Sequence, residues 1–305
     1  MAFSISDTPS LTGSVALVTG GNSGLGLASV KALASKGCHV LLGARDTAKG
    51  ERAATLIRDQ RPGSSIEVLQ LDLASQASIR SAVEEVGKNY ERVDILMNNA
   101  GIMAMPEMTT EDGYESQFGV NHLGHWTLTA LLMPKILAAP SPRVVTVTSS
   151  AHHLILGIDF RNPHMRGKYS PWNAYSQSKL ANYFFALGLH REFVRNGKRA
   201  MSLLAHPGLS HTNLQVETQE RGAGGATGAV FKFLAAKVGM SPDAGALPQL
   251  RAALDPKAKS GEFYAPRFLS TGAPVTRPFL RPNNGKNIEK LWQLSQRETG
   301  VALTI

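Results

Sequence analysis

Cysteine is almost absent from this chain of 305 residues, in which Cys38 is the only one. A single cysteine excludes an intramolecular disulfide and any zinc or iron–sulfur site built from several thiolates, and it favours a reducing compartment. Long apolar runs are missing too: no stretch of about 18 apolar residues occurs, and residues 1–14 do not have the pattern of a signal peptide. We therefore expect a cytoplasmic protein without a membrane span.

Acidic residues are in the minority, since 32 Lys and Arg against 23 Asp and Glu give a formal net charge of +9. The basic residues are scattered, with no tract of five or more. This distribution indicates a solvated basic surface and no nucleic-acid partner. The nine histidines show no recognised ligand spacing such as H-E-x-x-H, so no metal site is expected.

Short apolar runs rich in β-branched residues recur at wide intervals along the chain. They cover residues 15–18, 40–42, 66–71, 93–97, 144–147 and 201–204. Helix-length segments rich in Ala, Leu, Lys and Glu lie between them, and this alternation predicts a mostly parallel sheet with helices on both faces. The fold class is therefore α/β, a doubly wound Rossmann-type sheet.

No linker rich in Pro, Gly and Ser divides the chain, so a single domain is predicted over residues 1–305, with its core at 13–266. Two regions interrupt the alternation of strands and helices. Residues 209–240 are expected to form a mobile substrate lid, and residues 267–305 a tail strapped over the body.

The first apolar run leads directly into the sequence T-G-G-N-S-G-L-G, followed by a helix. Glycines let the backbone turn sharply and approach a ligand closely, and the free N–H groups at a helix start attract phosphate. The loop therefore predicts a dinucleotide site. The residues assigned to it are Gly20, Asn22, Ser23, Gly24, Leu25 and Gly26.

The end of the second apolar run bears on which dinucleotide binds. An acidic residue there would bind the ribose of NAD, whereas this chain has Arg45, whose guanidinium suits the 2′-phosphate of NADP. NADP is therefore expected in preference to NAD; a surface ion pair between Arg45 and Asp46 is the alternative. Asp72 and Leu73, after the third run, are assigned to the same cofactor site, with Asp72 accepting from the adenine amino group.

Further motifs follow the later apolar runs. They are N-N-A-G at 98–101, N-H-L-G-H-W from Asn121, S-S at 149–150 and Y-S-Q-S-K from Tyr175. With the glycine loop, they resemble the short-chain dehydrogenase/reductase family over residues 13–266, and within it the retinol dehydrogenase and protochlorophyllide reductase branch.

The resemblance implies the remaining site residues. The implied catalytic set is Asn121, Ser150, Tyr175 and Lys179. The implied cofactor contacts are Asn99, Ala100, Gly101, Tyr175 and Lys179, with Pro207, Gly208 and Thr212 in a turn that holds the nicotinamide carboxamide. Ser149 competes with Ser150 for one role, and the family pattern aligns with Ser150.

The chemistry of the tyrosine and lysine follows from their spacing. Tyr175 and Lys179 are four residues apart, so one helical turn places them on the same face. A free phenol has a pKa of about 10, and a nearby ammonium, with the positive ring of an oxidised nicotinamide, favours the phenolate, so a lowered pKa is expected for Tyr175. Tyr175 would give a proton to a carbonyl oxygen that Ser150 also binds. As the family implies, Asn121 would hold a water in a proton relay towards Lys179.

The substrate is expected to be a lipophilic aldehyde or ketone, or the corresponding alcohol. The insert at 152–172 and the lid are rich in apolar residues, which predicts an apolar pocket, unless these side chains only pack the loops together. A second hypothesis is a non-catalytic NADP-binding sensor or scaffold of the same fold. Pairing through residues 173–195 would give a homodimer or homotetramer, whereas a tail over that surface would leave a monomer.

Overall fold

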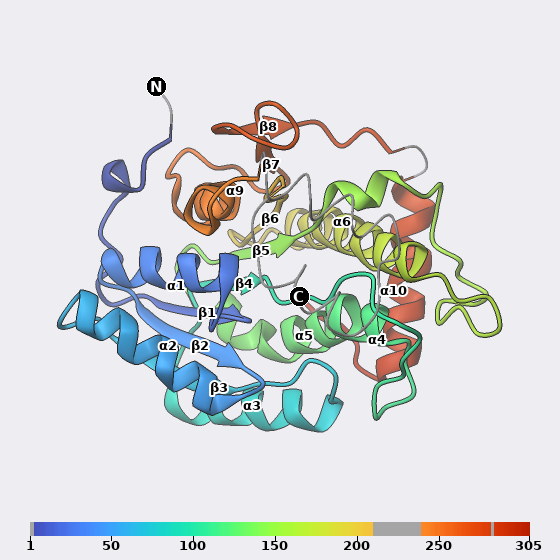
Figure 1. Cartoon of the computed structure of the whole chain (residues 1–305), viewed down its shortest axis with the longest axis horizontal. Coiled ribbons are helices and arrows are strands. Elements are labelled where there is room, and N and C mark those ends of the chain that lie inside the picture. The colour runs from blue at the N-terminus through green and yellow to red at the C-terminus, as the bar shows by residue number, and fades with distance from the viewer. Residues whose placement is uncertain (1–2, 210–238, 282–283) are drawn as a thin grey trace.

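The computed structural model describes residues 3–209, 239–281 and 284–305. In this part of the chain, eight strands form one sheet in the order β3-β2-β1-β4-β5-β6-β7-β8 (Figure 1). Neighbouring strands are parallel except β7 and β8, which are antiparallel. The predicted doubly wound α/β class is therefore confirmed. Most of the expected lid, including Thr212, lies outside the described residues.

The strands and helices alternate along the chain. The strands are β1 (Val15–Thr19), β2 (His39–Ala44), β3 (Ile66–Gln70), β4 (Ile95–Asn98), β5 (Arg143–Val147), β6 (Met201–Ala205), β7 (Phe263–Pro266) and β8 (Pro274–Arg277). The α-helices are α1 (Gly24–Ser35), α2 (Thr47–Gln60), α3 (Gln76–Asn89), α4 (Ser116–Phe118), α5 (Gly124–Leu137), α6 (Pro171–Arg195), α9 (Pro242–Leu254) and α10 (Asn284–Thr299). Short 3-10 turns η1 (Ile5–Asp7) and η3 (Ser150–His153) and a π-helical turn η2 (Gly119–Leu123) complete them.

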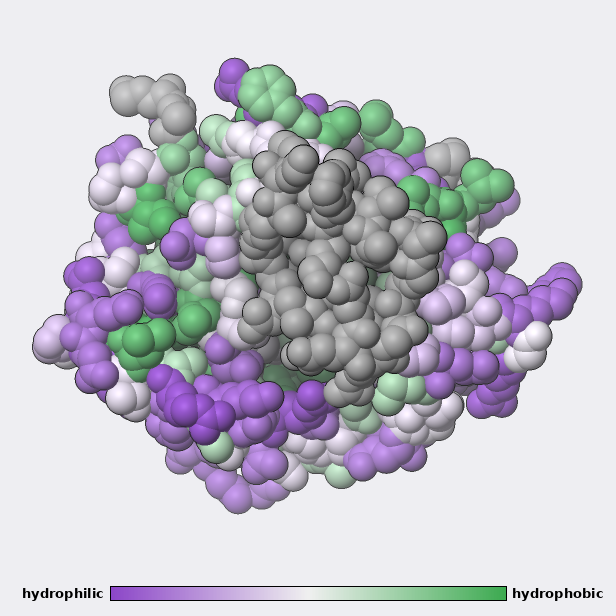
Figure 2. All heavy atoms as spheres, viewed as in Figure 1, coloured by the Kyte–Doolittle hydropathy of each residue, from purple (hydrophilic) through white to green (hydrophobic). Residues whose placement is uncertain are grey.

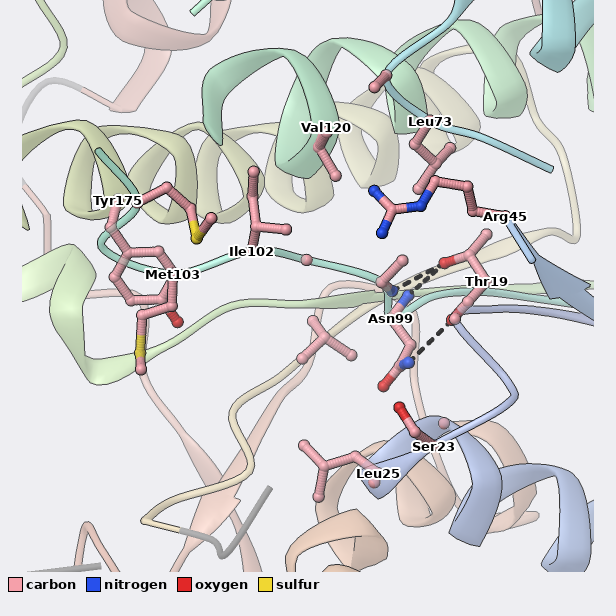
Figure 3. A pocket seen from close by; sticks show the side chains of 18 of the residues that line it. Thr19, Ser23, Leu25, Arg45, Leu73, Asn99, Ile102, Met103, Val120 and Tyr175 are labelled. Carbon is pink, nitrogen blue, oxygen red and sulfur yellow. Dashed lines mark hydrogen bonds between the residues drawn. The ribbon is translucent and has the colours of Figure 1, made fainter. Parts of the chain in front are cut away.

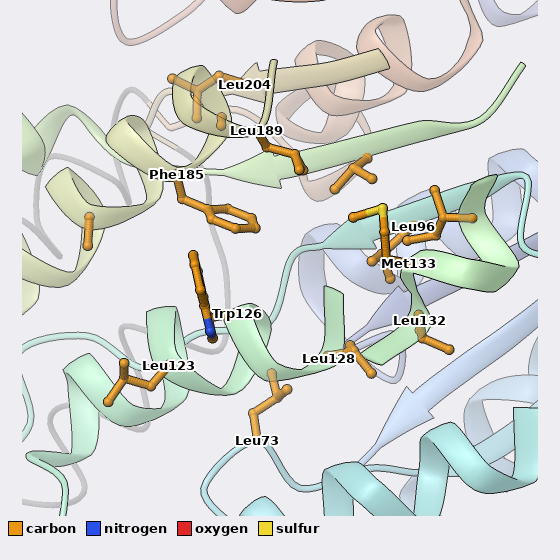
Figure 4. Close-up of a cluster of buried hydrophobic side chains, with 14 of the residues drawn as sticks. Leu73, Leu96, Leu123, Trp126, Leu128, Leu132, Met133, Phe185, Leu189 and Leu204 are labelled. Atoms are coloured by element: carbon orange, nitrogen blue, oxygen red, sulfur yellow. The ribbon is translucent and has the colours of Figure 1, made fainter. Parts of the chain in front are cut away.

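Alternate residues of each strand pack on opposite faces of the sheet. On β1, Leu17 packs with the layer of α3, α5 and α6, whereas Ala16 and Val18 pack with α1, α2 and α9. All three side chains are fully buried, as expected for strands covered on both sides. Figure 4 shows the first of these layers, where the rings of Trp126 and Phe185 pack edge to face. Their centroids are 5.9 Å apart.

Two strands were not predicted from the sequence. Strand β7 extends the parallel sheet, and β8 lies in the segment expected to be a tail. Each has only four residues and one of them is a proline, Pro266 in β7 and Pro274 in β8, which obscures the strand pattern. Strand β8 tolerates its proline because it is an edge strand, where one side of the backbone needs no partner in the sheet.

The C-terminal helix α10 packs on the outside of α6. Gly188 of α6 makes room for the indole of Trp292, since a Cβ on this glycine would lie 2.3 Å from the ring. Ile288 and Leu291 are buried beside it. The apolar face of α10 is therefore held against the body of the molecule.

The outward faces of the helices are polar. Figure 2 shows hydrophilic side chains gathered along the lower left of the molecule, over α2 and α3. Within the described ranges, no helix combines the length and the apolar character that crossing a bilayer requires.

The order of the strands reverses at β1, which pairs with β2 on one side and β4 on the other. The chain therefore leaves the carboxyl ends of β1 and β4 towards opposite faces of the sheet. In open α/β sheets, a ligand crevice forms at such a reversal.

Candidate active site

A cavity of about 390 Å³ opens at the carboxyl ends of β1, β4 and β5 (Figure 3). The glycine loop and Arg45 lie towards one end of it, and Tyr175 lies at the other. The structure brings nearly all of the predicted site residues to this cavity. Those that line it are Gly20, Asn22, Ser23, Gly24, Leu25, Gly26, Arg45, Asp72, Leu73, Asn99, Ala100, Gly101, Ser150, Tyr175, Lys179, Pro207 and Gly208.

The loop after β1 needs glycine for two different reasons. Gly20 has a φ of +64°, and a Cβ there would lie 3.1 Å from Ala100. A Cβ on Gly26 would lie 2.1 Å from the carbonyl oxygen of Gly20. Ser23 precedes α1 as its N-cap, but its side chain makes no capping hydrogen bond. The start of α1 therefore offers unsatisfied N–H donors to an anion, which fits a dinucleotide phosphate.

Charged side chains from the end of β2 and the first turn of α2 line the cavity. Arg45 and Lys49 are both exposed and both line it, as does Asp46 between them. The neighbouring carboxylate of Asp46 caps α2 by accepting the backbone N–H of Lys49 at 3.0 Å, and this bond lowers the pKa of Asp46. Asp46 is therefore engaged at the helix start, and Lys49 is a cavity residue that the sequence analysis missed.

Asp72 and Leu73 are held at the rim of the cavity by a tight turn after β3. The Asp72 carboxylate accepts the backbone N–H of Ala74 at 2.9 Å, and the Asp72 N–H donates to the hydroxyl of Ser78 at 3.0 Å. Figure 3 shows Leu73 beside the side chain of Arg45.

The side chain of Thr19 joins β1 to the segment after β4. Its Oγ1 accepts the backbone N–H groups of Asn99 and Ala100, both at 2.9 Å. In turn, Nδ2 of the Asn99 side chain donates a hydrogen bond to the Thr19 carbonyl at 2.8 Å (Figure 3). These bonds hold residues 99–101 next to the glycine loop.

Tyr175 and Lys179 face the other end of the cavity from one turn of α6, and both are almost completely buried. Lys179 Nζ lies 5.9 Å from the centre of the tyrosine ring and donates to the carbonyl of Val147 at 3.4 Å. Burial lowers the pKa of Lys179 to about 8. Burial also raises the pKa of Tyr175 to about 12, although a hydrogen bond with Ser149 acts in the opposite direction.

Desolvation of the phenolate is the largest effect on the pKa of Tyr175, and the Lys179 ammonium lies over the tyrosine ring. The expected lowering of this pKa also involves the positive ring of an oxidised nicotinamide, so it stays a prediction for the complex with the cofactor.

Ser149 and Ser150 both line the cavity, and the hydroxyl of Ser149 lowers the pKa of Tyr175. Ser149 continues the extended backbone of β5 (φ −144°, ψ 155°), is partly buried, and accepts the backbone N–H of Ala151 at 3.2 Å. Ser150, which the sequence analysis chose, is the first residue of the 3-10 turn η3 and is exposed at the rim. Ser149 is therefore a second candidate for the role predicted for Ser150.

Asn121 lies behind Gly101 in the π-helical turn η2. Its Oδ1 accepts the N–H of Ile102 at 2.8 Å, and its Nδ2 donates to the Ile102 carbonyl at 2.9 Å and to Ser178 at 2.8 Å. A Cβ on Gly101 would lie 3.0 Å from Asn121 Oδ1 and 3.2 Å from Lys179 Nζ, so both groups border the same glycine. The Asn121 amide therefore fixes the backbone beside the lysine.

Residues 14–222 match the family model described as short chain dehydrogenase. The chain belongs to the short-chain dehydrogenase family. It is accordingly an oxidoreductase of carbonyl and alcohol groups, in the branch that contains the retinol dehydrogenases.

Several relatives of this dehydrogenase align along most of its length. Human retinol dehydrogenase 13 is 36% identical over 298 residues, which cover 95% of this chain and 86% of the relative. Human polyprenol dehydrogenase is 33% identical over 293 residues, covering 94% and 85%. A crystal structure of a Mycobacterium paratuberculosis protein is 37% identical, covers 100% of both chains and has a TM-score of 0.79.

A further structure, from Beutenbergia cavernae, is described as that of an NAD(P)-dependent gluconate 5-dehydrogenase with bound NADP at low occupancy. It is 27% identical, covers 81% of this chain and 91% of its own, and has a TM-score of 0.62.

The apolar wall of the dehydrogenase cavity comes from a segment that the sequence analysis did not select. It is built by residues after β4 and at the start of the following helix: Ile102, Met103, Met105, Met108 and Val120. The insert at 152–172, which was expected to supply the wall, contributes no residue to the described lining. Leu154 of the insert is 62% exposed, whereas Ile155 and Phe160 pack against the core. The sequence signal that could have indicated this wall is the group of three methionines within six residues shortly after N-N-A-G.

Replacing Lys179 with methionine is expected to stabilise the dehydrogenase while removing its activity. Burial lowers the lysine's pKa from 10.5 to about 8 in the folded state, so folding carries a penalty while the lysine is charged. The Lys179→Met variant should gain up to about 3 kcal/mol in unfolding free energy below pH 8, since one pKa unit corresponds to about 1.4 kcal/mol.

The gain should shrink as the pH rises towards 10.5, where the unfolded chain also loses the proton. Urea unfolding of both proteins at pH 7 and pH 10 measures the difference. A variant that is less stable at pH 7, or a gain independent of pH, would contradict the assigned cause of the pKa shift.

Proposed function

We propose that this dehydrogenase interconverts a lipophilic aldehyde or ketone and the corresponding alcohol with NADP(H), using Tyr175 as the acid/base. The observation that carries the proposal is that Tyr175, buried on α6, lines the same end of the cavity as Ser149, while the other end has the geometry of a phosphate site.

The protein groups at this end are suited to polarising a carbonyl. A substrate oxygen placed against Ser149 and Tyr175 would accept a hydrogen bond from each hydroxyl, and these bonds strengthen as negative charge develops on it. With a pKa raised to about 12 by burial, Tyr175 is protonated at neutral pH and is ready to donate. When bound, the nicotinamide ring exchanges a hydride with the substrate carbon. Lys179 places a positive charge beneath the tyrosine ring, which favours the tyrosinate left after proton transfer.

The preference for NADP rests on two cations, one directly after β2 and one in the first turn of α2. Arg45 and Lys49 are available to a 2′-phosphate, and the nearest acidic residue, Asp46, is occupied as the cap of α2. The NADP described in the Beutenbergia cavernae relative supports the same choice.

The proposed substrate class rests on the apolar wall and on the relatives. Met103, Met105 and Met108 adapt their shape easily, so they suit elongated apolar molecules of varied outline. The names of the relatives refer to retinol and polyprenol, which are lipophilic alcohols.

The first test follows NADPH oxidation at the nicotinamide absorbance with a panel of lipophilic aldehydes, retinal, steroid ketones and quinones. The Tyr175→Phe variant should lose about 1,000-fold in kcat, because it lacks the acid/base hydroxyl. Its Kd for NADPH, measured by fluorescence titration, should stay within about twofold of the wild type.

The matched control is Tyr183→Phe, which removes another buried hydroxyl from the same helix, away from the cavity lining. Turnover that survives in Tyr175→Phe would exclude this tyrosine as the acid/base. Tight NADPH binding with no turnover of any compound by the wild type would favour a sensor.

The neighbouring serines give a second test within the same assay. Ser149→Ala should lower kcat by about 100-fold, because it removes a donor to the developing oxyanion. Ser150→Ala should stay within about twofold, because its side chain is exposed and lies outside the tyrosine contact. The reverse pattern would support the assignment of Ser150.

Cofactor preference is tested with Arg45→Asp. Its Kd for NADPH should rise at least about tenfold, because hydrogen bonds to a charged group contribute about 1.5–3 kcal/mol. Its Kd for NADH should change much less, since NADH has no 2′-phosphate. Arg61→Asp makes the same charge change at the far end of α2, outside the cavity lining, and serves as the control. An NADPH affinity that responds equally to both variants would argue against a direct contact by Arg45.

A further inference from the structure

His125 is a buried histidine that joins the two ends of the site without lining the cavity. It lies on the first turn of α5 and is only 1% exposed. Its Nε2 is 2.8 Å from Thr19 Oγ1, and its Nδ1 is 3.0 Å from the carbonyl oxygen of Asn121. One ring therefore contacts both the strand that leads into the glycine loop and the turn that carries Asn121.

The partners of the ring determine where its proton lies. A carbonyl oxygen only accepts, so Nδ1 carries the hydrogen and donates it to Asn121. In the neutral ring, Nε2 is then an acceptor. Thr19 Oγ1 already accepts two backbone N–H groups, so its own proton is available, and Nε2 at 2.8 Å is closer than the alternative acceptor, the Met97 carbonyl at 3.3 Å.

The result is a directed chain of hydrogen bonds. The N–H groups of Asn99 and Ala100 donate to Thr19, Thr19 donates to His125, and His125 donates to the Asn121 carbonyl. Burial lowers the pKa of His125 to about 4, and the charge of Lys179 acts in the same direction. The ring is therefore neutral over the physiological pH range, as this chain requires.

The backbone around Asn121 explains why such a support is needed. Residues 119–123 form a π-helical turn, in which the N–H of Gly124 bonds the carbonyl of Gly119, five residues back. The turn brings the Asn121 side chain to Ile102 and Ser178, close to Lys179. π-Helical turns are rare and occur often at functional sites.

We propose that His125 is a positioning residue with two separable tasks. Its Nε2 orients the Thr19 hydroxyl that holds residues 99–101 beside the glycine loop, and so supports cofactor binding. Its Nδ1–H holds the Asn121 turn beside Lys179, and so supports the proton-transfer end. The effects expected on kcat rest on the proposed function, whereas those expected on the Kd for NADPH do not.

The two tasks are separated by two conservative variants. The amide of an asparagine reaches the position of Nδ1 and that of a glutamine reaches the position of Nε2. His125→Asn should keep kcat within about twofold while raising the Kd for NADPH about fivefold, since one neutral hydrogen bond is worth about 1 kcal/mol. His125→Gln should show the opposite pattern, with an about fivefold lower kcat and an almost unchanged Kd. Thr19→Val should raise the Kd for NADPH more than His125→Asn does, because it also removes the acceptor of the Asn99 and Ala100 N–H groups.

The neighbouring His122 provides the control. It is equally buried, but its Nε2 contacts Ser295 of α10, away from the cavity. His122→Gln and His122→Asn should change the thermal midpoint while leaving kcat and the Kd for NADPH at wild-type values. A merely structural role for His125 predicts this same behaviour.

Equal changes of kcat and Kd in the two His125 variants, or no change in either, would overturn the proposal. If the wild type turns over no compound, the proposed function fails, but the NADPH titration still tests whether His125 supports cofactor binding through Thr19. A Kd that is higher in His125→Asn than in His125→Gln then supports the inference, and equal values overturn it.

Discussion

The site depends on a single buried hydroxyl, that of Thr19, which joins the carboxyl ends of β1 and β4. These strands are neighbours at the point where the order of the sheet reverses, and the hydroxyl accepts the first two N–H groups of the segment after β4. The glycine loop leaves from one strand and the apolar wall from the other. Thr19 is fully buried, so water does not compete for these bonds, and both ends of the cavity take their position from this junction.

Burial governs the reactive end of the cavity. Tyr175 and Lys179 lie on α6 with little access to water, and desolvation shifts both pKa values so that the neutral forms are favoured. Within the described residues, the hydrogen bond of Lys179 is to a carbonyl at 3.4 Å, so burying its charge reduces the stability of the fold. Such groups are retained where chemistry needs them, which is consistent with the place of Lys179 in a dehydrogenase.

Local patterns were sufficient for much of the fold and for the family. The alternation of strands and helices predicted the doubly wound sheet, and the motifs from the glycine loop to Tyr175 identified the short-chain dehydrogenases. Strands β7 and β8 were not predicted, because four residues that include a proline give too weak a strand pattern. The apolar wall was assigned to the insert at 152–172 and to the lid, most of which lies outside the described residues. The insert does not line the cavity, since composition indicates apolar side chains but not the direction in which they point.

The sequence alone determined what depends on neighbouring residues in the chain. Glycine at positions 20 and 26 and the four-residue spacing of Tyr175 and Lys179 are local requirements, because a tight turn and one helical turn involve only a few residues. Tertiary structure decided that burial raises the pKa of the tyrosine and that His125 bridges Thr19 and Asn121. These features depend on burial and on contacts between residues up to 106 positions apart, which arise only when the sheet is assembled.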